Sequence, residues 1–207
     1  MESVALAVGS KPLFDPITLE VSSGEIAAVM GPSGSGKSSL LSLIAGLLSP
    51  AITAHGDVRI AGRSILGLPP ERRGVGLLFQ DDLLFPHLTV RDNLLFGLPA
   101  SVAPAERRAR AQEALEEAEL AGLEERDPAT LSGGQRTRVA LMRTLLSGPR
   151  ALLLDEPFSR LDDALRDRIR RFVFDHAARR NLPVLLVTHD PDDAAAAGGQ
   201  RVALHPA

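Results

Sequence analysis

Residues 31–38 read GPSGSGKS and match the pattern G-x-x-x-x-G-K-[ST] in full. The glycines of this pattern let the backbone turn so that successive N–H groups point at phosphate oxygens. A helix pattern follows, and its first turn adds a partial positive charge. We therefore expect Lys37 to reach the β- and γ-phosphates of a nucleotide and the Ser38 hydroxyl to coordinate Mg²⁺. The residues of this segment expected to bind the nucleotide are Gly31, Pro32, Ser33, Gly34, Ser35, Gly36, Lys37, Ser38 and Ser39.

Two acidic residues follow the apolar run at 151–154. We expect Asp155, at the end of this run, to hold Mg²⁺ directly or through a water molecule. Glu156 can orient or deprotonate an attacking water. The alternatives are a glycine-rich turn with an accidental lysine and a strand end with solvated acids. A strand, a loop and a helix in register argue against the first, and the co-occurrence of both motifs argues against the second.

The third motif is LSGGQ at 131–135, about a hundred residues after the phosphate-binding motif. Ser132 is a residue type that caps helix N-termini, and Gly133 and Gly134 let the backbone approach an anion closely. The next residues, QRTRVALMRTLL, predict a helix whose positive end would face a ligand. The alternative is an ordinary helix start with a flexible cap.

Together these motifs resemble the ATP-binding cassette (ABC) ATPases, and the resemblance spans nearly the whole chain. The motifs occur in the family's order: the Walker A run 31–38, Gln80 in LLFQDD, the signature 131–135, Walker B at 151–156, the D-loop SRLD at 159–162, and His189. The resemblance implies that two copies face each other head to tail with two ATP molecules between them. The signature of one copy then covers the open side of the phosphates that the other copy binds.

The resemblance also implies roles for single residues. Gln80 would sense Mg²⁺ and the attacking water, His189 would contact the γ-phosphate, and Asp162 would act across the dimer. The expected catalytic residues are Glu156, His189 and Gln80, and the expected metal ligands are Ser38, Gln80 and Asp155. The residues expected to contact the partner's nucleotide are Ser132, Gly133, Gly134, Gln135 and Asp162. A nucleotide kinase would share the phosphate-binding loop but has no use for LSGGQ.

Two positions depart from the family's pattern. The family usually stacks adenine on an aromatic residue, often tyrosine, before the Walker A run, and this chain has neither Tyr nor Trp. Phe14 is the nearby aromatic residue; its place before ITLEV favours a core position, with base stacking as the alternative. We therefore expect modest discrimination between bases. Arg160 lies in the D-loop, where a small or amide residue is commoner, and carries no functional prediction.

Three short apolar runs indicate the elements that position these residues: 25–30, 151–155 and 183–189. None alternates with polar residues, which is typical of strands covered on both faces in a parallel sheet. Each run ends in glycine or polar residues, and ligands of open α/β sheets bind at the carboxyl ends of strands. One shared site is therefore expected.

The predicted fold class is α/β: a P-loop NTPase (RecA-like) parallel-sheet core with an antiparallel β flank and an inserted α-helical subdomain. Short strands in the first 25 residues and at 55–67 predict the flank. Within a single domain of residues 1–207, residues 1–80 and 148–207 are expected to form the nucleotide-binding core. Residues 81–147, whose pattern is helical, are expected to form the signature subdomain.

The composition limits the classes of function. The 207 residues are 44% hydrophobic and 24% charged, which is ordinary for a globular protein with a sizeable core. A net charge of −3 argues against a nucleic-acid partner. No apolar run approaches the roughly 20 residues of a membrane-spanning helix, and the N-terminus lacks the features of a signal peptide. The absence of cysteine fits the cytoplasm.

The predicted function is that of the ATP-hydrolysing subunit of an ABC transporter. Its expected partners are separate permease chains, a second copy of itself and an extracytoplasmic solute-binding protein, and its expected place is the cytoplasmic face of the plasma membrane. The apolar segment 81–99 lies where the family docks the permease. Its LTVRDNLLFG pattern resembles bacterial importers of small nutrients or ions. The alternatives are a non-transport cassette that regulates a membrane or assembly partner and a DNA-repair ATPase, which the lack of heptads disfavours.

Overall fold

The structure of the protein is a computed structural model that describes residues 1–205. These residues form two compact units. Unit 1 comprises Met1–Leu77, Arg150–Glu156 and the described residues from His176 on. Unit 2 comprises Leu78–Pro149 and Pro157–Asp175. We predicted that residues 1–80 and 148–207 form the nucleotide-binding core and that residues 81–147 form the signature subdomain. This assignment of functions stays a prediction.

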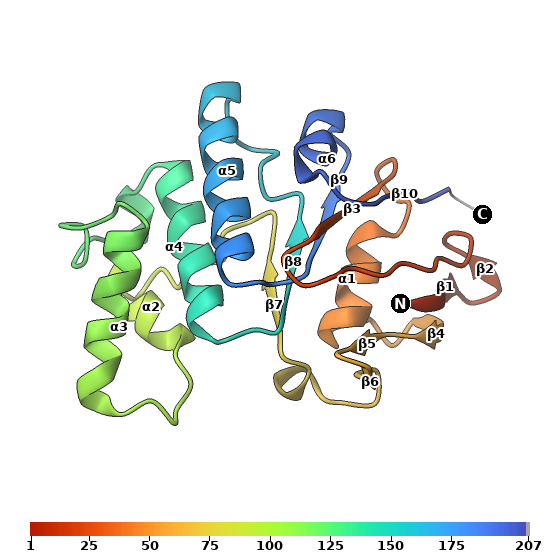
Figure 1. Ribbon diagram of the computed structural model, residues 1–207, viewed down its shortest axis with the longest axis horizontal. Helices are drawn as coiled ribbons and strands as arrows, with labels where there is room; N and C mark the ends of the chain where they lie inside the picture. Colours follow the sequence, from red (N-terminus) through yellow and green to blue (C-terminus); the bar gives the residue numbers. More distant parts are fainter. Residues whose placement is uncertain (206–207) are drawn as a thin grey trace. The chain divides into compact units, whose positions relative to one another are not determined.

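The centre of unit 1 is a five-stranded sheet with the strand order β10–β3–β9–β8–β7 (Figure 1). Its strands are β3 (Ile26–Met30), β7 (Val75–Leu78), β8 (Ala151–Asp155), β9 (Val184–Thr188) and β10 (Arg201–Ala203). Strand β3 pairs in parallel with β10 and β9, and β8 pairs in parallel with β9. The three predicted strands are therefore neighbours in the sheet. Every residue of β9 is buried, which explains why its sequence does not alternate.

An antiparallel flank accompanies this sheet, as predicted. It has the order β2–β1–β4, formed by β1 (Glu2–Val8), β2 (Lys11–Pro12) and β4 (Ile52–Asp57). A small hairpin of β5 (Arg59–Ile60) and β6 (Arg63–Ser64) follows. Phe14 is only 1% exposed and packs in the core that the flank shares with the sheet and with Leu40. The core position expected for Phe14 is confirmed, and its ring has no open face for a base.

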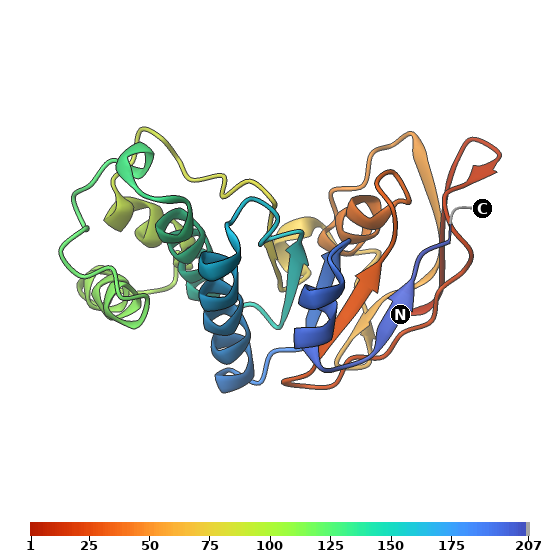
Figure 2. The same cartoon turned by 90° about the horizontal axis from the view of Figure 1, so that it is seen from above.

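Two helices follow strands of the sheet and pack against it (Figure 2). Helix α1 (Lys37–Ala45) follows β3 and contacts β8, and α6 (Pro191–Ala197) follows β9 and packs against β9 and β3. A short 3-10 helix, η1 (Pro70–Arg72), precedes β7. Because β3 and β9 run in parallel, the residues that follow them emerge at the same edge of the sheet.

The buried Arg73 closes the carboxyl end of α1. Its guanidinium donates hydrogen bonds to four backbone carbonyls, those of Leu43 (2.5 Å), Ile44 (3.1 Å), Leu66 (3.0 Å) and Leu68 (2.8 Å). Leu43 and Ile44 lie in the last turn of α1, where carbonyls lack partners within the helix and the dipole is negative. Burial lowers the pKa of Arg73 below its ordinary value. Arg73 thus fixes the end of α1 opposite to the phosphate-binding loop.

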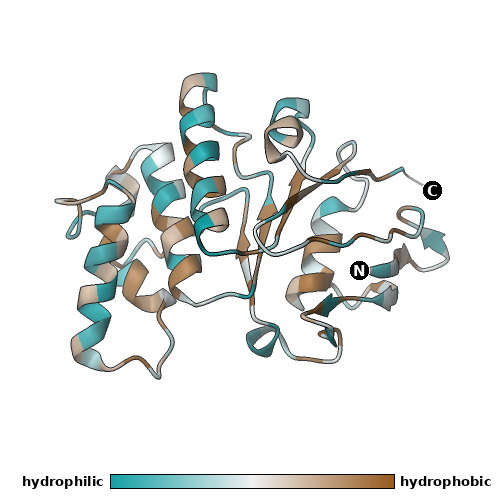
Figure 3. Ribbon diagram, in the orientation of Figure 1, coloured by the Kyte–Doolittle hydropathy of each residue, from teal (hydrophilic) through white to brown (hydrophobic). Residues whose placement is uncertain are grey.

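Unit 2 is helical, which confirms the predicted helical insertion. It contains α2 (Val90–Gly97), α3 (Pro104–Glu117), the 3-10 helix η2 (Pro128–Thr130), α4 (Gly133–Leu146) and most of α5 (Asp163–Arg179). Helices α2, α3 and α4 pack on one another, and Figure 3 shows that α3 is more hydrophilic than the strands of unit 1. Within residues 1–205, no helix is both long enough and apolar enough to cross a membrane.

Candidate nucleotide-binding and hydrolysis site

The loop between β3 and α1 forms an open backbone cradle. Gly34 and Gly36 have positive φ values of 80° and 91°, a conformation that glycine adopts at no steric cost. A side chain on Gly36 would also collide with the ring of Phe14, 2.9 Å from its Cβ. Within the part of the chain that the structure describes, no side chain caps the first turn of α1. Its N–H groups are therefore available to an anion, as expected from the motif.

Two side chains of this loop fit a phosphate ligand. The hydroxyl of Ser35 is buried and has no hydrogen-bond partner among residues 1–205. Lys37 is 5% exposed, and its ammonium donates to the carbonyls of Gly31 (2.8 Å) and Pro32 (2.9 Å). A buried ammonium without a full complement of charged partners favours a nearby anion. The cradle therefore matches the negative charge and the acceptor oxygens of a polyphosphate.

Ser38 and Asp155 come together at the carboxyl ends of β3 and β8. The Ser38 hydroxyl donates to Oδ1 of Asp155 over 3.1 Å, although 117 positions separate the two residues. Burial raises the pKa of Asp155, the neighbouring Glu156 raises it further, and the Ser38 hydrogen bond and Lys37 oppose the rise. Hydroxyl and carboxylate oxygens are ligands that Mg²⁺ prefers, and a cation would offset the burial of this carboxylate. The pair fits a magnesium ion.

Glu156 lies between Lys37 and His189. One carboxylate oxygen is 3.6 Å from the Lys37 ammonium, and the other is 3.0 Å from Nδ1 of His189. The Glu156 backbone has a φ of 45°, the left-handed region that costs a non-glycine residue about 1–3 kcal/mol. Its N–H donates to the Val187 carbonyl of β9 over 2.9 Å, which holds this conformation. Unit 1 thus brings together Lys37, Glu156 and His189 from three separate segments.

The turn after β9 positions His189. The hydroxyl of Thr188 accepts a hydrogen bond from the N–H of Asp190 over 3.0 Å. The Asp190 carboxylate in turn accepts from the N–H of Asp192 over 2.8 Å and caps α6. These bonds leave the His189 ring 57% exposed beside Glu156, where it can meet a ligand.

In unit 2, the signature motif begins helix α4. Ser132 and Gln135 form a capping box: the Ser132 hydroxyl accepts from the Gln135 N–H (3.3 Å), and the Gln135 side chain accepts from the Ser132 N–H (2.9 Å). The two glycines differ. Gly134 is buried, and a Cβ there would lie 2.8 Å from Leu165 of α5, so its small size serves helix packing. Gly133 has only an ordinary contact, 3.6 Å from Leu161, and remains open to a ligand.

The Q-loop residue and the D-loop also meet within unit 2. The amide of Gln80 donates to the Ser159 hydroxyl over 3.2 Å, and Asp81 forms an ion pair with Arg160. Arg160 therefore has a partner, which its unusual place in the D-loop did not predict. Asp162 caps α5, because its carboxylate accepts from the N–H of Leu165 over 3.0 Å.

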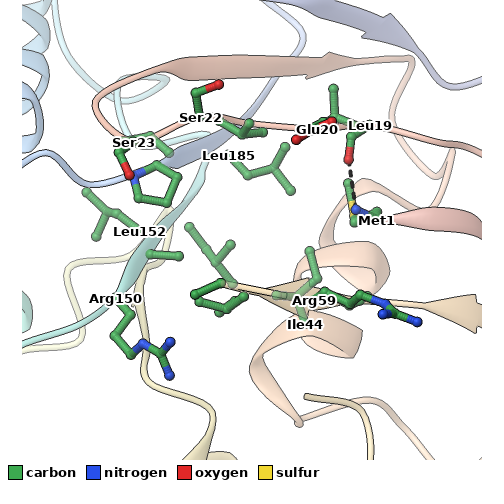
Figure 4. Close-up of a pocket in the computed structure, with 18 of the residues that line it drawn as sticks. Met1, Leu19, Glu20, Ser22, Ser23, Ile44, Arg59, Arg150, Leu152 and Leu185 are labelled. Carbon is green, nitrogen blue, oxygen red and sulfur yellow. Dashed lines mark hydrogen bonds between the residues drawn. The ribbon is translucent and has the colours of Figure 1, made fainter. Parts of the chain in front are cut away.

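A separate hollow of about 650 Å³ lies at the opposite ends of the strands (Figure 4). Arg150 and Leu152 at the start of β8 line it, together with Leu185 of β9 and Ile44 of α1, and Arg59 lies at its edge. None of the residues expected to bind the nucleotide, to hold the metal or to act in catalysis lines this hollow. The chemistry therefore belongs to the carboxyl ends of the strands.

Comparison with known proteins identifies the family. The model of the ABC transporter family matches residues 14–159. The chain belongs to the ABC transporter family. It is 46% identical over 196 residues to YnjD of Escherichia coli K12, an uncharacterized ABC transporter ATP-binding protein, which covers 95% of this chain and 90% of that protein. The chain is accordingly an ABC ATPase.

Two further relatives carry the names of importers. The thiamine import ATP-binding protein ThiQ of Cereibacter sphaeroides is 52% identical over 172 residues, 83% of this chain and 73% of that protein. The sulfate/thiosulfate import ATP-binding protein CysA 1 of Rhizobium meliloti is 44% identical over 201 residues, 94% of this chain and 56% of that protein. Among solved structures, a dimeric post-hydrolysis state of the ATP-binding cassette MJ0796 bound to ADP and Pi matches with a TM-score of 0.77. It is 32% identical, and the match covers 97% of this chain and 94% of that one.

The motif patterns did not indicate several residues that organise the ABC ATPase. Arg73 is one, because a buried arginine and its exposed neighbour Arg72 have the same appearance in a sequence. Asn93 is another: it is fully buried, and its amide bonds the N–H (2.8 Å) and the carbonyl (3.1 Å) of Phe85. In the sequence, the signal that could have pointed to it is an asparagine among the apolar residues of LTVRDNLLFG.

Proposed function

We propose that this chain is the ATP-hydrolysing subunit of an ABC importer, which pairs head to tail with a second copy and drives a separate membrane permease. The observation that carries the proposal is the convergence of Lys37, Ser38, Asp155, Glu156 and His189 at the carboxyl ends of three neighbouring strands. Family membership and two relatives named as import proteins support the transport assignment.

The phosphates of ATP would bind the backbone N–H groups at the start of α1. Lys37 now donates to two carbonyls of its own loop, and these bonds are weaker than those to a charged phosphate. We therefore expect Lys37 to exchange at least one carbonyl for phosphate oxygens when ATP binds. The exchange would also loosen its 3.6 Å contact with Glu156 and release that carboxylate for catalysis.

Ser38 and Asp155 would hold Mg²⁺, with Gln80 as a further ligand. The ion supplies charge neutralisation at the phosphates, where phosphoryl transfer depends on positioning and electrostatics. The 3.1 Å contact between the Ser38 hydroxyl and the Asp155 carboxylate, which brings two oxygen atoms together, supports this assignment. Gln80 and the D-loop hydroxyl of Ser159 would respond to the same nucleotide.

Glu156 would accept a proton from the attacking water. General-base catalysis of this kind contributes roughly 10²–10⁴-fold to a rate. His189 lies 3.0 Å from the Glu156 carboxylate, so it can orient that carboxylate and also meet the γ-phosphate. The two residues directly follow β8 and β9, which are adjacent strands. The sheet thus fixes the spacing between base and histidine.

The signature helix would act on the nucleotide of the partner copy. Ser132 is exposed, Gly133 is open, and the N-terminus of α4 has a partial positive charge. These features suit a phosphate that another chain presents. The dimeric state of MJ0796, bound to ADP and Pi, supports such an arrangement for this family.

An apolar surface of unit 2 would dock the permease. Leu83 is 55% exposed and Phe96 is 65% exposed. The Phe96 ring packs against the Phe85 ring at a tilt of 58°, with 4.5 Å between centroids, and the Arg143 guanidinium lies 5.3 Å from the Phe85 ring. Large exposed apolar side chains gathered in one place are typical of interaction sites. This surface belongs to the segment 81–99, where docking was expected, and would place the chain as a peripheral subunit on the cytoplasmic face of the plasma membrane.

The proposed cargo is a small nutrient or ion that an extracytoplasmic solute-binding protein delivers. The names of the thiamine and sulfate import relatives support import over export. A non-transport ABC ATPase that regulates a membrane or assembly partner is the second candidate, because regulation would use the same surface. Co-purification with a polytopic membrane protein whose transport activity depends on this chain would decide for the importer.

The test of the ATPase assignment compares two variants. Glu156→Gln is expected to bind ATP and form dimers but to lose at least about 100-fold in turnover, because it lacks a general base. Lys37→Ala is expected to weaken ATP binding about 10–100-fold, the equivalent of one charge-assisted hydrogen bond. Steady-state phosphate release and equilibrium nucleotide binding measure these effects. Glu113→Gln, the same chemical change on an exposed residue of α3, is the control. Wild-type turnover in the Glu156 variant would refute the assignment.

A further inference from the structure

Asp82, two residues after Gln80, is bound to the signature helix. Its side chain is only 21% exposed, and one oxygen accepts a hydrogen bond from the Thr137 hydroxyl over 2.9 Å. The other oxygen lies 3.4 Å from Nε of Arg136. Arg136 and Thr137 lie in the first turns of α4 and directly follow the signature motif 131–135. The loop that carries Gln80 is therefore anchored on the helix that presents the signature.

Thr137 stands between Asp82 and the signature itself. The threonine is 5% exposed, and its hydroxyl also lies 3.2 Å from the Gly133 carbonyl. A hydroxyl has one hydrogen to donate, so it bonds either the carboxylate or the carbonyl at full strength. The charged carboxylate is the stronger acceptor. Any movement of Asp82 would therefore change the bond available to the Gly133 carbonyl.

The backbone around Asp82 is held to the same helix. Arg143 of α4 donates to the carbonyls of Asp82 (3.3 Å) and Leu83 (2.9 Å). Leu83 has a φ of 44°, a strained conformation for a leucine, which these bonds help to maintain. Asn93 of α2 fixes the loop further along at Phe85. These contacts make the loop move together with α4.

The contacts that Gln80 and its neighbour Asp81 make with the D-loop are weaker than the bond between Asp82 and Thr137. Gln80 meets Ser159 at 3.2 Å, and the Asp81–Arg160 ion pair joins side chains that are 56% and 62% exposed. Exposed ion pairs of this kind contribute little, because water screens both charges. The part-buried Asp82–Thr137 bond is therefore the contact on which coupling would depend.

We propose that Asp82 is a positioning residue that couples Gln80 to the signature of the same chain through Thr137. The inference rests on the proposed function: Gln80 would serve the nucleotide of its own copy, whereas Ser132–Gln135 would serve that of the partner. The Asp82–Thr137 bond then connects the two nucleotide sites of the dimer. A nucleotide that displaces Gln80 in one site shifts the glycine turn that faces the other.

The test uses two variants of Thr137 in the full chain. Thr137→Val removes the hydroxyl and keeps the shape, whereas Thr137→Ser keeps the hydroxyl. We expect the valine variant to lose about tenfold in kcat and to lower the Hill coefficient for ATP toward 1, and the serine variant to stay within about twofold of wild type. The ATP affinity of single copies, measured in the Glu156→Gln background under dilute conditions, should stay within about twofold in both.

The double variant and a control exclude a general packing defect. Asp82→Ala combined with Thr137→Val should lower kcat no further than the more severe single variant, because each substitution removes the bond between Asp82 and Thr137. Thr144→Val, on the same helix, removes a hydroxyl that donates to the Ala140 carbonyl of its own helix (2.9 Å) and should retain full activity and cooperativity.

Three results would overturn the proposal. The first is equal kcat and Hill coefficient in the valine and serine variants. The second is a double variant in which the fold-loss of kcat from the Asp82 substitution multiplies with the fold-loss from Thr137→Val. The third combines two observations. The wild-type chain shows no cooperativity for ATP, and the Glu156→Gln variant forms no dimer in the presence of ATP. Only this third result would also overturn the proposed dimer, so the two failures can be told apart.

Discussion

Replacing Arg73 with methionine tests how the carboxyl end of α1 is held. Methionine fills a similar volume but cannot donate, so four carbonyls lose their shared partner. A hydrogen bond to a charged group contributes about 1.5–3 kcal/mol, and four would give about 6–12 kcal/mol if they were independent. They share one guanidinium whose pKa burial lowers, so its desolvation offsets part of this sum. We expect a net loss of about 3–5 kcal/mol.

Urea unfolding followed by circular dichroism measures this loss, and the melting temperature should fall by roughly 6–20 °C at about 2–4 °C per kcal/mol. The neighbouring Arg72 is exposed, so Arg72→Met is a matched control that should change stability by less than about 0.5 kcal/mol. Nine residues of helix separate Arg73 from the phosphate loop, about 13 Å. Folded Arg73→Met protein should therefore still bind ATP with near wild-type affinity. Equal midpoints for the two methionine variants would refute the capping role.

Three other predictions follow from local geometry. Gly97→Ala should lower stability by about 2–4 kcal/mol, because its Cβ would overlap the Arg143 carbonyl oxygen of α4; a normal melting curve would contradict this. ATP and GTP should bind within about tenfold of each other, because Phe14 is buried and aromatic stacking contributes about 0.5–1.5 kcal/mol; competition binding measures the ratio. A hydrogen bond from Ser64 and the charge of Arg59 lower the pKa of Asp57 below 3.8, so they stabilise the fold above this pH and the effect disappears as the pH falls through the lowered pKa. Ser64→Ala should therefore melt lower than wild type at pH 6, and the difference should shrink toward pH 3.

The sequence was sufficient to predict the elements that bury apolar residues on both faces. Strands β3, β8 and β9 have continuous apolar runs, and the glycines of the phosphate loop are set by backbone geometry that no other residue adopts cheaply. Strands β7 and β10 were not predicted, because VGLL and RVA are too short for a pattern to emerge. They join the sheet by pairing with neighbours that are distant in the chain.

The candidate site was predictable where chemistry requires a residue type at a fixed spacing. Lys37, Ser38, Asp155 and Glu156 meet that condition. The partner of Arg160 and the anchoring of Asp82 depend instead on which loops fold against each other, and residues separated by 55 or 79 positions carry no local signal of their contact. For Gly134, the sequence motif identified the residue but not the full reason for it. The motif suggested contact with an anion, whereas the structure shows that a side chain here would collide with Leu165 of α5.

The left-handed backbone of Glu156 sets activity against heat resistance at one position. Glycine or asparagine would adopt a φ of 45° with less strain, so either replacement is expected to raise the melting temperature while it removes the carboxylate. A laboratory evolution experiment that selects only for survival of heating would accumulate such replacements and return robust but inactive protein. Any engineering programme for this chain therefore has to select for turnover at every round.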